Sequence, residues 1–80
     1  MRKGELCEKL MQEKYKSDGC VIIPTGKGSD FLTLCEPDNR PTFVEVKDGC
    51  KSNLTKFQKE FREKVLKEKI ADYKVERCGC

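Results

Sequence analysis

Residues 42–47, Thr-Phe-Val-Glu-Val-Lys, constrain the fold of this chain more than any other stretch. The stretch is rich in β-branched and aromatic residues and therefore predicts a strand. Because side chains alternate across a strand, Glu45 and Lys47 point to one face. Val44 and Val46 point to the other. A carboxylate and an ammonium in a core-like strand are costly to bury alone, so they must be solvated, paired with each other or part of a site.

The chain of 80 residues has room for one small domain, residues 1–80, with a modest core. It carries 17 basic and 14 acidic residues, which gives a net charge of +3. The sequence contains no run of eighteen apolar residues, so no membrane span is expected. The N-terminal residues lead into charged sequence without the apolar segment of a signal peptide, and we therefore expect a cytoplasmic protein.

Six cysteines raise the question of disulfides or a metal site. The chain has no histidine and no Cys-x-x-Cys pair, which argues against both. Cys7 and Cys20 fall where apolar residues are expected, so packing as small hydrophobic side chains is the favoured interpretation. Cys78 and Cys80 are interpreted as two free thiols, with a shared metal ion or an intermolecular disulfide as the alternatives.

The hydrophobic pattern predicts a fold of the α/β class with the element order α-β-β-β-α-β. Helices are expected over residues 4–16 and 55–69, and strands over residues 20–23, 29–34, 42–47 and 73–78. Gly19 is expected to end the first helix in the left-handed conformation. The turn over residues 35–41 joins the second and third strands most simply as an antiparallel hairpin.

The two predicted helices each carry an apolar face. In the first helix this face consists of Leu6, Cys7, Leu10, Met11 and Tyr15. Glu8 lies on its edge, about 100° from Cys7, and is the acidic residue best placed to look towards a sheet. The alternative, which periodicity alone favours, is that Glu8 is a rim glutamate paired with its neighbours. The face of the second helix consists of Leu54, Phe57, Phe61 and Val65, and Thr55 with Gln58 has the spacing of a capping box.

The predicted hairpin sets the position of Asp30. A roughly symmetric loop puts position 30 opposite position 46, give or take one residue, so the Asp30 carboxylate lies beside Glu45. Like charges in opposite positions destabilise a sheet unless a positive group sits between them. A divalent cation is the obvious candidate, because Mg²⁺ prefers oxygen ligands and is held by one or two carboxylates with phosphate and water.

These residues carry a resemblance. A glutamate on the first helix, Asp30 after a Gly-containing loop, Glu45-x-Lys47 on the next strand and Gln58 on the following helix resemble the PD-(D/E)XK nuclease superfamily. Within it, the pattern is most similar to the virus-type replication-repair nuclease (VRR-NUC) domain, and the N-terminal run is also similar to archaeal Holliday-junction resolvases. The resemblance implies a restriction-endonuclease-like core, a small mixed sheet flanked by helices. Ser29 stands where the family usually has proline or another small residue.

The resemblance also implies roles. Asp30, Glu45 and the backbone carbonyl of Val46 would bind Mg²⁺ or Mn²⁺, with Glu8 completing the site directly or through water. Lys47 would orient the attacking water and offset charge on the phosphate, and Gln58 would position Lys47 or a phosphate. The expected activity is a metal-dependent endonuclease that acts on branched or junction DNA in replication, repair or recombination and leaves 5′-phosphate ends.

The charge balance agrees with a nucleic-acid partner. Setting aside the three proposed carboxylate ligands leaves 17 basic against 11 acidic residues, a surface of +6 around an acidic pocket. Lys27, Lys51, Lys56 and Lys59 are the expected DNA-binding residues. For the lysine-rich second helix the alternative is a solvated face with pairs such as Glu60–Lys64 and Glu63–Lys67.

Two further expectations concern the whole chain. The first is an alternative function, a non-catalytic nucleic-acid-binding or assembly module in which Asp30, Glu45 and Lys47 form a structural ion-pair cluster. The second is a homodimer, because Leu66 and Ile70 lie off the apolar face of the second helix and give it more apolar surface than its own sheet covers. A two-fold interface would bury that excess, whereas the alternative is cover from the first helix or the last strand.

Overall fold

The computed structural model describes residues 3–26 and 28–79. These residues form two helices and four strands in the order predicted. The bounds are α1 (Lys3–Ser17), β1 (Cys20–Pro24), β2 (Phe31–Cys35), β3 (Arg40–Asp48), α2 (Lys56–Lys67) and β4 (Asp72–Cys78). Gly19 has a φ of 86°, so the left-handed end of α1 is confirmed.

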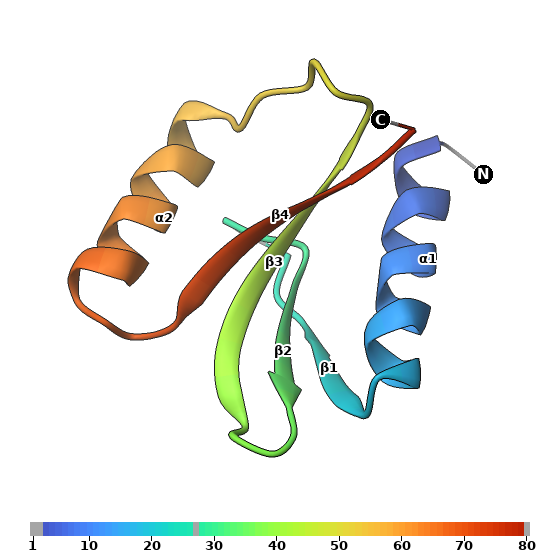
Figure 1. Ribbon diagram of the computed structural model, residues 1–80. Coiled ribbons are helices and arrows are strands. Elements are labelled where there is room, and N and C mark those ends of the chain that lie inside the picture. Colours follow the sequence, from blue (N-terminus) through green and yellow to red (C-terminus); the bar gives the residue numbers. More distant parts are fainter. Residues whose placement is uncertain (1–2, 27, 80) are drawn as a thin grey trace.

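The strands form one mixed sheet in the order β1-β2-β3-β4. β2 pairs antiparallel with both β1 and β3, which confirms the hairpin, and β4 runs parallel to β3. The parallel pairing follows from the connection between the two strands. Helix α2 carries the chain from the end of β3 back to the level of its start, where β4 begins. The two helices lie on opposite sides of the sheet (Figure 1).

The hydrophobic core lies between the sheet and α1. Phe31 and Val44 are fully buried, and Val46 and Cys7 complete the central cluster. Tyr15 of α1 meets the Phe31 ring edge-on, with 5.8 Å between ring centroids. The predicted alternation in β3 is therefore confirmed, since Val44 and Val46 face α1.

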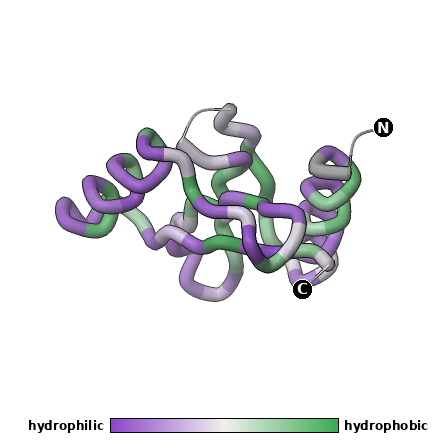
Figure 2. The backbone as a smooth tube through the Cα atoms, turned by 90° about the horizontal axis from the view of Figure 1, so that it is seen from above, coloured by the Kyte–Doolittle hydropathy of each residue, from purple (hydrophilic) through white to green (hydrophobic). Residues whose placement is uncertain are grey.

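The contact face of α1 differs from the predicted one. Cys7, Met11 and Tyr15, spaced four residues apart, pack onto the core, whereas Leu6 and Leu10 are 51% and 57% exposed. A sheet as small as this one covers only a narrow stripe of a helix. Leu6 and Leu10, which precede Cys7 and Met11 by one residue, are therefore left in solvent. Figure 2 shows hydrophobic and hydrophilic residues interleaved along α1.

The first strand is also less buried than predicted. Cys20 is buried and Ile22 packs on the core, but Val21 and Ile23 are 58% and 43% exposed. The reason is position, because β1 is an edge strand and α1 covers only one of its two faces.

The interpretation of the cysteines as packed thiols is wrong. Cys7 of α1 is bonded to Cys78 of β4, and Cys20 is bonded to Cys35, its partner in the β1–β2 register. None of the described cysteines is free. Cys80 lies outside the described residues. The linear spacing did not suggest these bonds, because the sheet brings distant parts of the chain together.

Helix α2 packs on the sheet face opposite α1. The Thr55–Gln58 capping box is confirmed, with both of its hydrogen bonds present. Val65 is buried, and the Phe61 ring lies 5.0 Å from that of Phe43. Phe57 is 57% exposed, so its predicted place on the buried face is wrong. Neither of the described helices is long and apolar enough to cross a membrane.

Candidate functional site

Asp30 stands directly before β2 and is held there by backbone contacts. Its N–H donates to the carbonyl oxygen of Val44 at 2.9 Å, and its Oδ2 accepts a hydrogen bond from the N–H of Val46 at 2.6 Å. Because Phe31 pairs with Val44, the register continued by one residue puts Asp30 opposite Glu45. The predicted position is thus confirmed within its stated margin.

The turn before Asp30 is fixed by a second set of hydrogen bonds. The Thr25 hydroxyl lies 2.8 Å from both the carbonyl oxygen and the hydroxyl of Ser29, which is buried. Gly28 is also buried, and its carbonyl accepts a 2.7 Å hydrogen bond from the Tyr73 hydroxyl. A Cβ at Gly28 would lie 2.6 to 2.9 Å from ring carbons of Phe61. The absence of a side chain at Gly28 therefore lets the Phe61 ring of α2 pack directly against this turn.

Glu45 and Lys47 project from the α2 side of β3. The Lys47 Nζ lies 3.3 Å from the Glu45 Oε2, and the two side chains are 16% and 6% exposed. Of the alternatives considered from the sequence, the pairing of the two charges is therefore observed, and the pair is nearly enclosed. Burial raises the pKa of Glu45 above its usual range and the charge of Asp30 raises it further, whereas Lys47 and a hydrogen bond from Gln58 lower it.

Gln58 is oriented by the start of α2. Its Oε1 accepts the Thr55 N–H at 2.9 Å, so its amide nitrogen is free to donate in the direction of Glu45. The capping box and a role in the site are thus compatible, because the two ends of one amide serve them separately.

Glu8 of α1 is linked to the site through the charge of Asp30. Burial raises the pKa of Glu8, and the nearby negative charge of Asp30 is the next largest cause. Its Oε1 accepts a 3.4 Å hydrogen bond from Gln12, which matches the rim interpretation as well. Asp30 is therefore the common neighbour of two glutamates that come from different elements.

Sequence reasoning missed Tyr73 and Arg77 of β4. Burial raises the pKa of Tyr73 to about 12, and the charge of Glu45 is the next largest cause, so the phenol stays neutral. The Arg77 Nη1 donates to the carbonyl oxygens of Gly49 and Ser52, at 3.1 and 2.6 Å. The parallel register that sets Arg77 beside Lys47 is what places it there. No local signal in the sequence shows that pairing.

The donor set fits an open cation site made of two carboxylates. In residues 3–26 and 28–79 no group of three or more His, Cys, Asp or Glu side chains is close enough to hold a metal ion. Asp30 and Glu45 are nevertheless adjacent acids whose negative charges repel one another, and the Lys47 ammonium lies close to Glu45 and partly offsets them. Mg²⁺ is commonly held by one or two carboxylates with water and phosphate, so these residues suit it.

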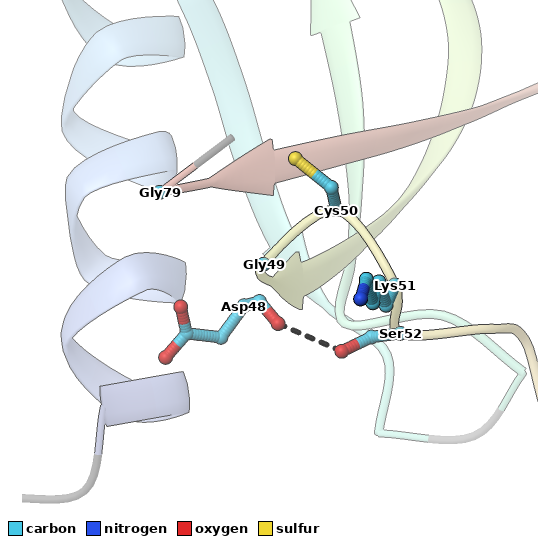
Figure 3. A pocket seen from close by; sticks show the side chains of 6 residues that line it. All are labelled: Asp48, Gly49, Cys50, Lys51, Ser52 and Gly79. Carbon is cyan, nitrogen blue, oxygen red and sulfur yellow. Dashed lines mark hydrogen bonds between the residues drawn. The ribbon is translucent and has the colours of Figure 1, made fainter.

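The described members of the expected DNA-binding lysines lie on the loop after β3 and on α2. Lys51 lines a hollow of about 550 Å³ with Asp48, Gly49, Ser52 and others, where β3 and β4 end (Figure 3). The Ser52 hydroxyl donates to the Asp48 carbonyl oxygen at 2.7 Å, which closes this loop. Lys56 and Lys59 are exposed on α2. Lys27 lies outside the described residues.

Comparisons with protein-family models, with curated proteins and with solved structures find no match to this chain. The functional argument therefore depends on the chemistry of the residues that the fold brings together. Those are Asp30 before β2, Glu45 and Lys47 on β3, Gln58 on α2 and Glu8 on α1.

Proposed function

We propose that this chain is a divalent-metal-dependent DNA endonuclease of the PD-(D/E)XK type, acting on branched or junction DNA. One observation carries the proposal. Glu45 and Lys47 form a nearly enclosed ion pair on β3. Asp30, which precedes β2, and Gln58 of α2 both act on Glu45. Within the cluster, burial and the charge of Asp30 raise the pKa of Glu45, and acids perturbed in this way occur preferentially at functional sites.

The side chains divide the chemistry among them. Asp30 and Glu45 would hold the cation, and the hydrogen bond from the Val46 N–H fixes one Asp30 oxygen so that the carboxylate keeps its direction. When bound, Mg²⁺ or Mn²⁺ would polarise the scissile phosphate and lower the pKa of a bound water. Lys47 offsets negative charge on the reacting phosphate and orients the attacking water. Gln58 donates a hydrogen bond to Glu45 through its amide and would position Lys47 or a phosphate.

Glu8 takes a supporting role in this scheme. Burial raises its pKa and the charge of Asp30 raises it further, so Glu8 lies within the electrostatic influence of Asp30. We assign Glu8 the role of holding a water of the cation's shell. The N–H of Val46 donates to Asp30, which keeps this residue next to the site. The carbonyl oxygen of Val46 remains a proposed ligand of the cation.

A non-catalytic binding module is the second candidate, and a specific observation favours it. Glu45 is already paired with Lys47, and Asp30 is already bonded to the Val46 N–H. Buried charges that are paired or hydrogen-bonded within the protein are also what a structural ion-pair cluster requires. The two candidates differ in one property, which is metal-dependent cleavage.

The test compares isosteric variants in cleavage and in binding. Asp30→Asn and Glu45→Gln are expected to lower the rate of DNA cleavage in Mg²⁺ by about a thousandfold or more. DNA binding, measured in Ca²⁺ or EDTA, should stay equal or become tighter, because each change removes negative charge from the approach of a phosphate. Glu63→Gln, an exposed acid on α2, is the matched control and should leave both unchanged.

Loss of binding in step with loss of cleavage would indicate a folding defect, which circular dichroism of each variant reveals. DNA binding by the wild-type chain without DNA cleavage in Mg²⁺ or Mn²⁺ would favour the non-catalytic module.

A further inference from the structure

Helix α2 carries an aromatic ring that the sheet does not cover. Phe57 is 57% exposed, although it directly precedes Gln58, whose amide donates a hydrogen bond to Glu45. Leu66 and Ile70 are 48% and 56% exposed, so the apolar excess expected from the sequence is also present. The expected homodimer stays a prediction. In Figure 2 the helix stands at the edge of the molecule.

The Phe57 ring is supported by a cluster of other rings. It stacks on Phe61, with 6.5 Å between the ring centroids. Phe61 in turn meets the rings of Phe43 and Tyr73 edge-on, at 5.0 and 6.1 Å. An exposed ring that is held in this way is preorganised, so it loses little conformational entropy when a ligand covers it.

The same ring borders a hollow. Phe57, Glu60, Phe61 and Lys64 line a depression of about 260 Å³, and their spacing of three, four and seven residues places them on one side of the helix. Pockets for drug-sized ligands measure roughly 300–1,000 Å³, so this hollow suits a smaller group. The ion pairs in the described residues join other side chains, so the Glu60–Lys64 pair considered from the sequence does not form.

The hollow lies next to the proposed metal site. Phe61 packs against Gly28, two residues before Asp30, since an added Cβ at Gly28 would lie 2.6 to 2.9 Å from its ring carbons. Gln58, which follows Phe57, contacts Glu45. The hollow and the two carboxylates are therefore connected through the Phe61 ring and the turn that ends at Asp30.

These groups match an unpaired nucleotide. A base presents a flat π face, which stacks on an exposed aromatic ring such as that of Phe57. The Glu60 carboxylate can only accept hydrogen bonds, and the N4 amino group of cytosine donates to such an acceptor. The Lys64 ammonium suits the phosphate of the same nucleotide. A base inside a duplex is stacked between its neighbours, so only an unpaired base offers its face to the ring.

We propose that the hollow beside Phe57 binds an unpaired nucleotide at the branch of the DNA substrate. The proposal rests on the proposed action on branched DNA and adds the residues that distinguish branched from linear DNA. Phe57 stacks on the base, Glu60 accepts a hydrogen bond from its amino group, and Lys64 pairs with its phosphate.

Fluorescence anisotropy in EDTA tests the proposal without cleavage, on a flap DNA whose first unpaired base is cytosine and on a linear duplex of the same paired sequence. The wild type should bind the flap at least about tenfold tighter than the duplex, and Phe57→Ala should raise the flap dissociation constant about tenfold, because one stacked base is lost. The duplex constant should not change. Leu66→Ala is the matched control, an apolar side chain of similar exposure about 180° round the helix from Phe57, and should change neither constant.

Two further variants separate the ring from the carboxylate. Phe57→Tyr keeps a stacking ring and should bind the flap as the wild type does. A flap whose first unpaired base is thymine offers no amino group, so the wild type should bind it about fivefold more weakly than the cytosine flap. Glu60→Ala should abolish this difference. Circular dichroism verifies that every variant is folded, and the wild-type comparisons need no variant.

Equal binding of the cytosine flap and the duplex by the wild type overturns the proposal. So does a thymine flap bound as tightly as the cytosine flap, or an equal effect of Phe57→Ala and Leu66→Ala. These outcomes concern binding alone and leave the nuclease activity to its own test. A chain that binds the flap through Phe57 but does not cut it in Mg²⁺ or Mn²⁺ would keep this proposal and overturn the nuclease activity.

Discussion

At the scale of single residues, Glu45 is a buried acid whose charge the fold disfavours. Burial and the charge of Asp30 raise its pKa above the unfolded value, so the protonated form is favoured on folding. The stability that this contributes is complete below the unfolded pKa of about 4.3 and is lost as the pH rises through the raised pKa. Glu45→Gln cannot titrate. The free energy of unfolding of the wild type, relative to this variant, should therefore fall between pH 4 and the raised pKa, as measured by urea denaturation; parallel curves would contradict it.

A cation should reverse that loss. If a carboxylate pair binds Mg²⁺ with a dissociation constant on the order of 1 mM, then 10 mM Mg²⁺ at pH 7.5 stabilises the fold by about 1.4 kcal/mol. For a domain of this size the midpoint of thermal unfolding should rise by about 5–10 °C. Asp30→Asn should remove the increase. An equal rise in the variant would show that Mg²⁺ acts elsewhere.

Gly28 shows how one residue fixes the distance between α2 and the sheet. It has a φ of 76°, and an added Cβ would meet the Phe61 ring at 2.6 Å. Gly26 has a similar φ of 80° with nothing within 4 Å, which makes it a matched control for backbone strain alone. Gly28→Ala should cost about 2 kcal/mol more in unfolding free energy than Gly26→Ala. Equal losses would mean that α2 shifts freely.

At the scale of the elements, the disulfides join what the sequence separates. The Cys7–Cys78 bond spans 71 residues and ties α1 to β4, whereas Cys20–Cys35 spans 15 and ties two neighbouring strands. The entropy of the closed loops predicts a loss of about 4 kcal/mol for Cys7→Ser/Cys78→Ser and about 3 kcal/mol for Cys20→Ser/Cys35→Ser. Chemical denaturation of both double variants gives the order, and a larger loss for the shorter loop would contradict it. Disulfides are rare in cytosolic proteins, so these bonds give no support to the expected cytoplasmic location. That location stays a prediction.

At the scale of the whole molecule, periodicity and turn chemistry were enough for the element order and the hairpin. The register followed from the hairpin, and with it the meeting of Asp30 and Glu45. Burial was predicted less well, as Phe57 and Val21 show, because a helix pattern does not reveal how narrow a stripe a small sheet covers. The disulfides and Arg77 were missed for another reason. Cys7–Cys78 and the position of Arg77 depend on β4 pairing in parallel with β3, and Cys20–Cys35 depends on the register of β1 and β2. The folded chain alone creates these contacts.

The central claim is that the Asp30–Glu45–Lys47 cluster cleaves DNA. The most direct measurement is incubation of linear, flap and four-way-junction DNA with the wild-type chain in Mg²⁺, Mn²⁺ or EDTA, with Lys47→Ala as the paired variant. We predict cleavage of branched DNA that requires the metal, leaves 5′-phosphate ends and falls by about a hundredfold or more in Lys47→Ala. Absence of cleavage on all three substrates, or cleavage that Lys47→Ala leaves unchanged, would contradict the claim.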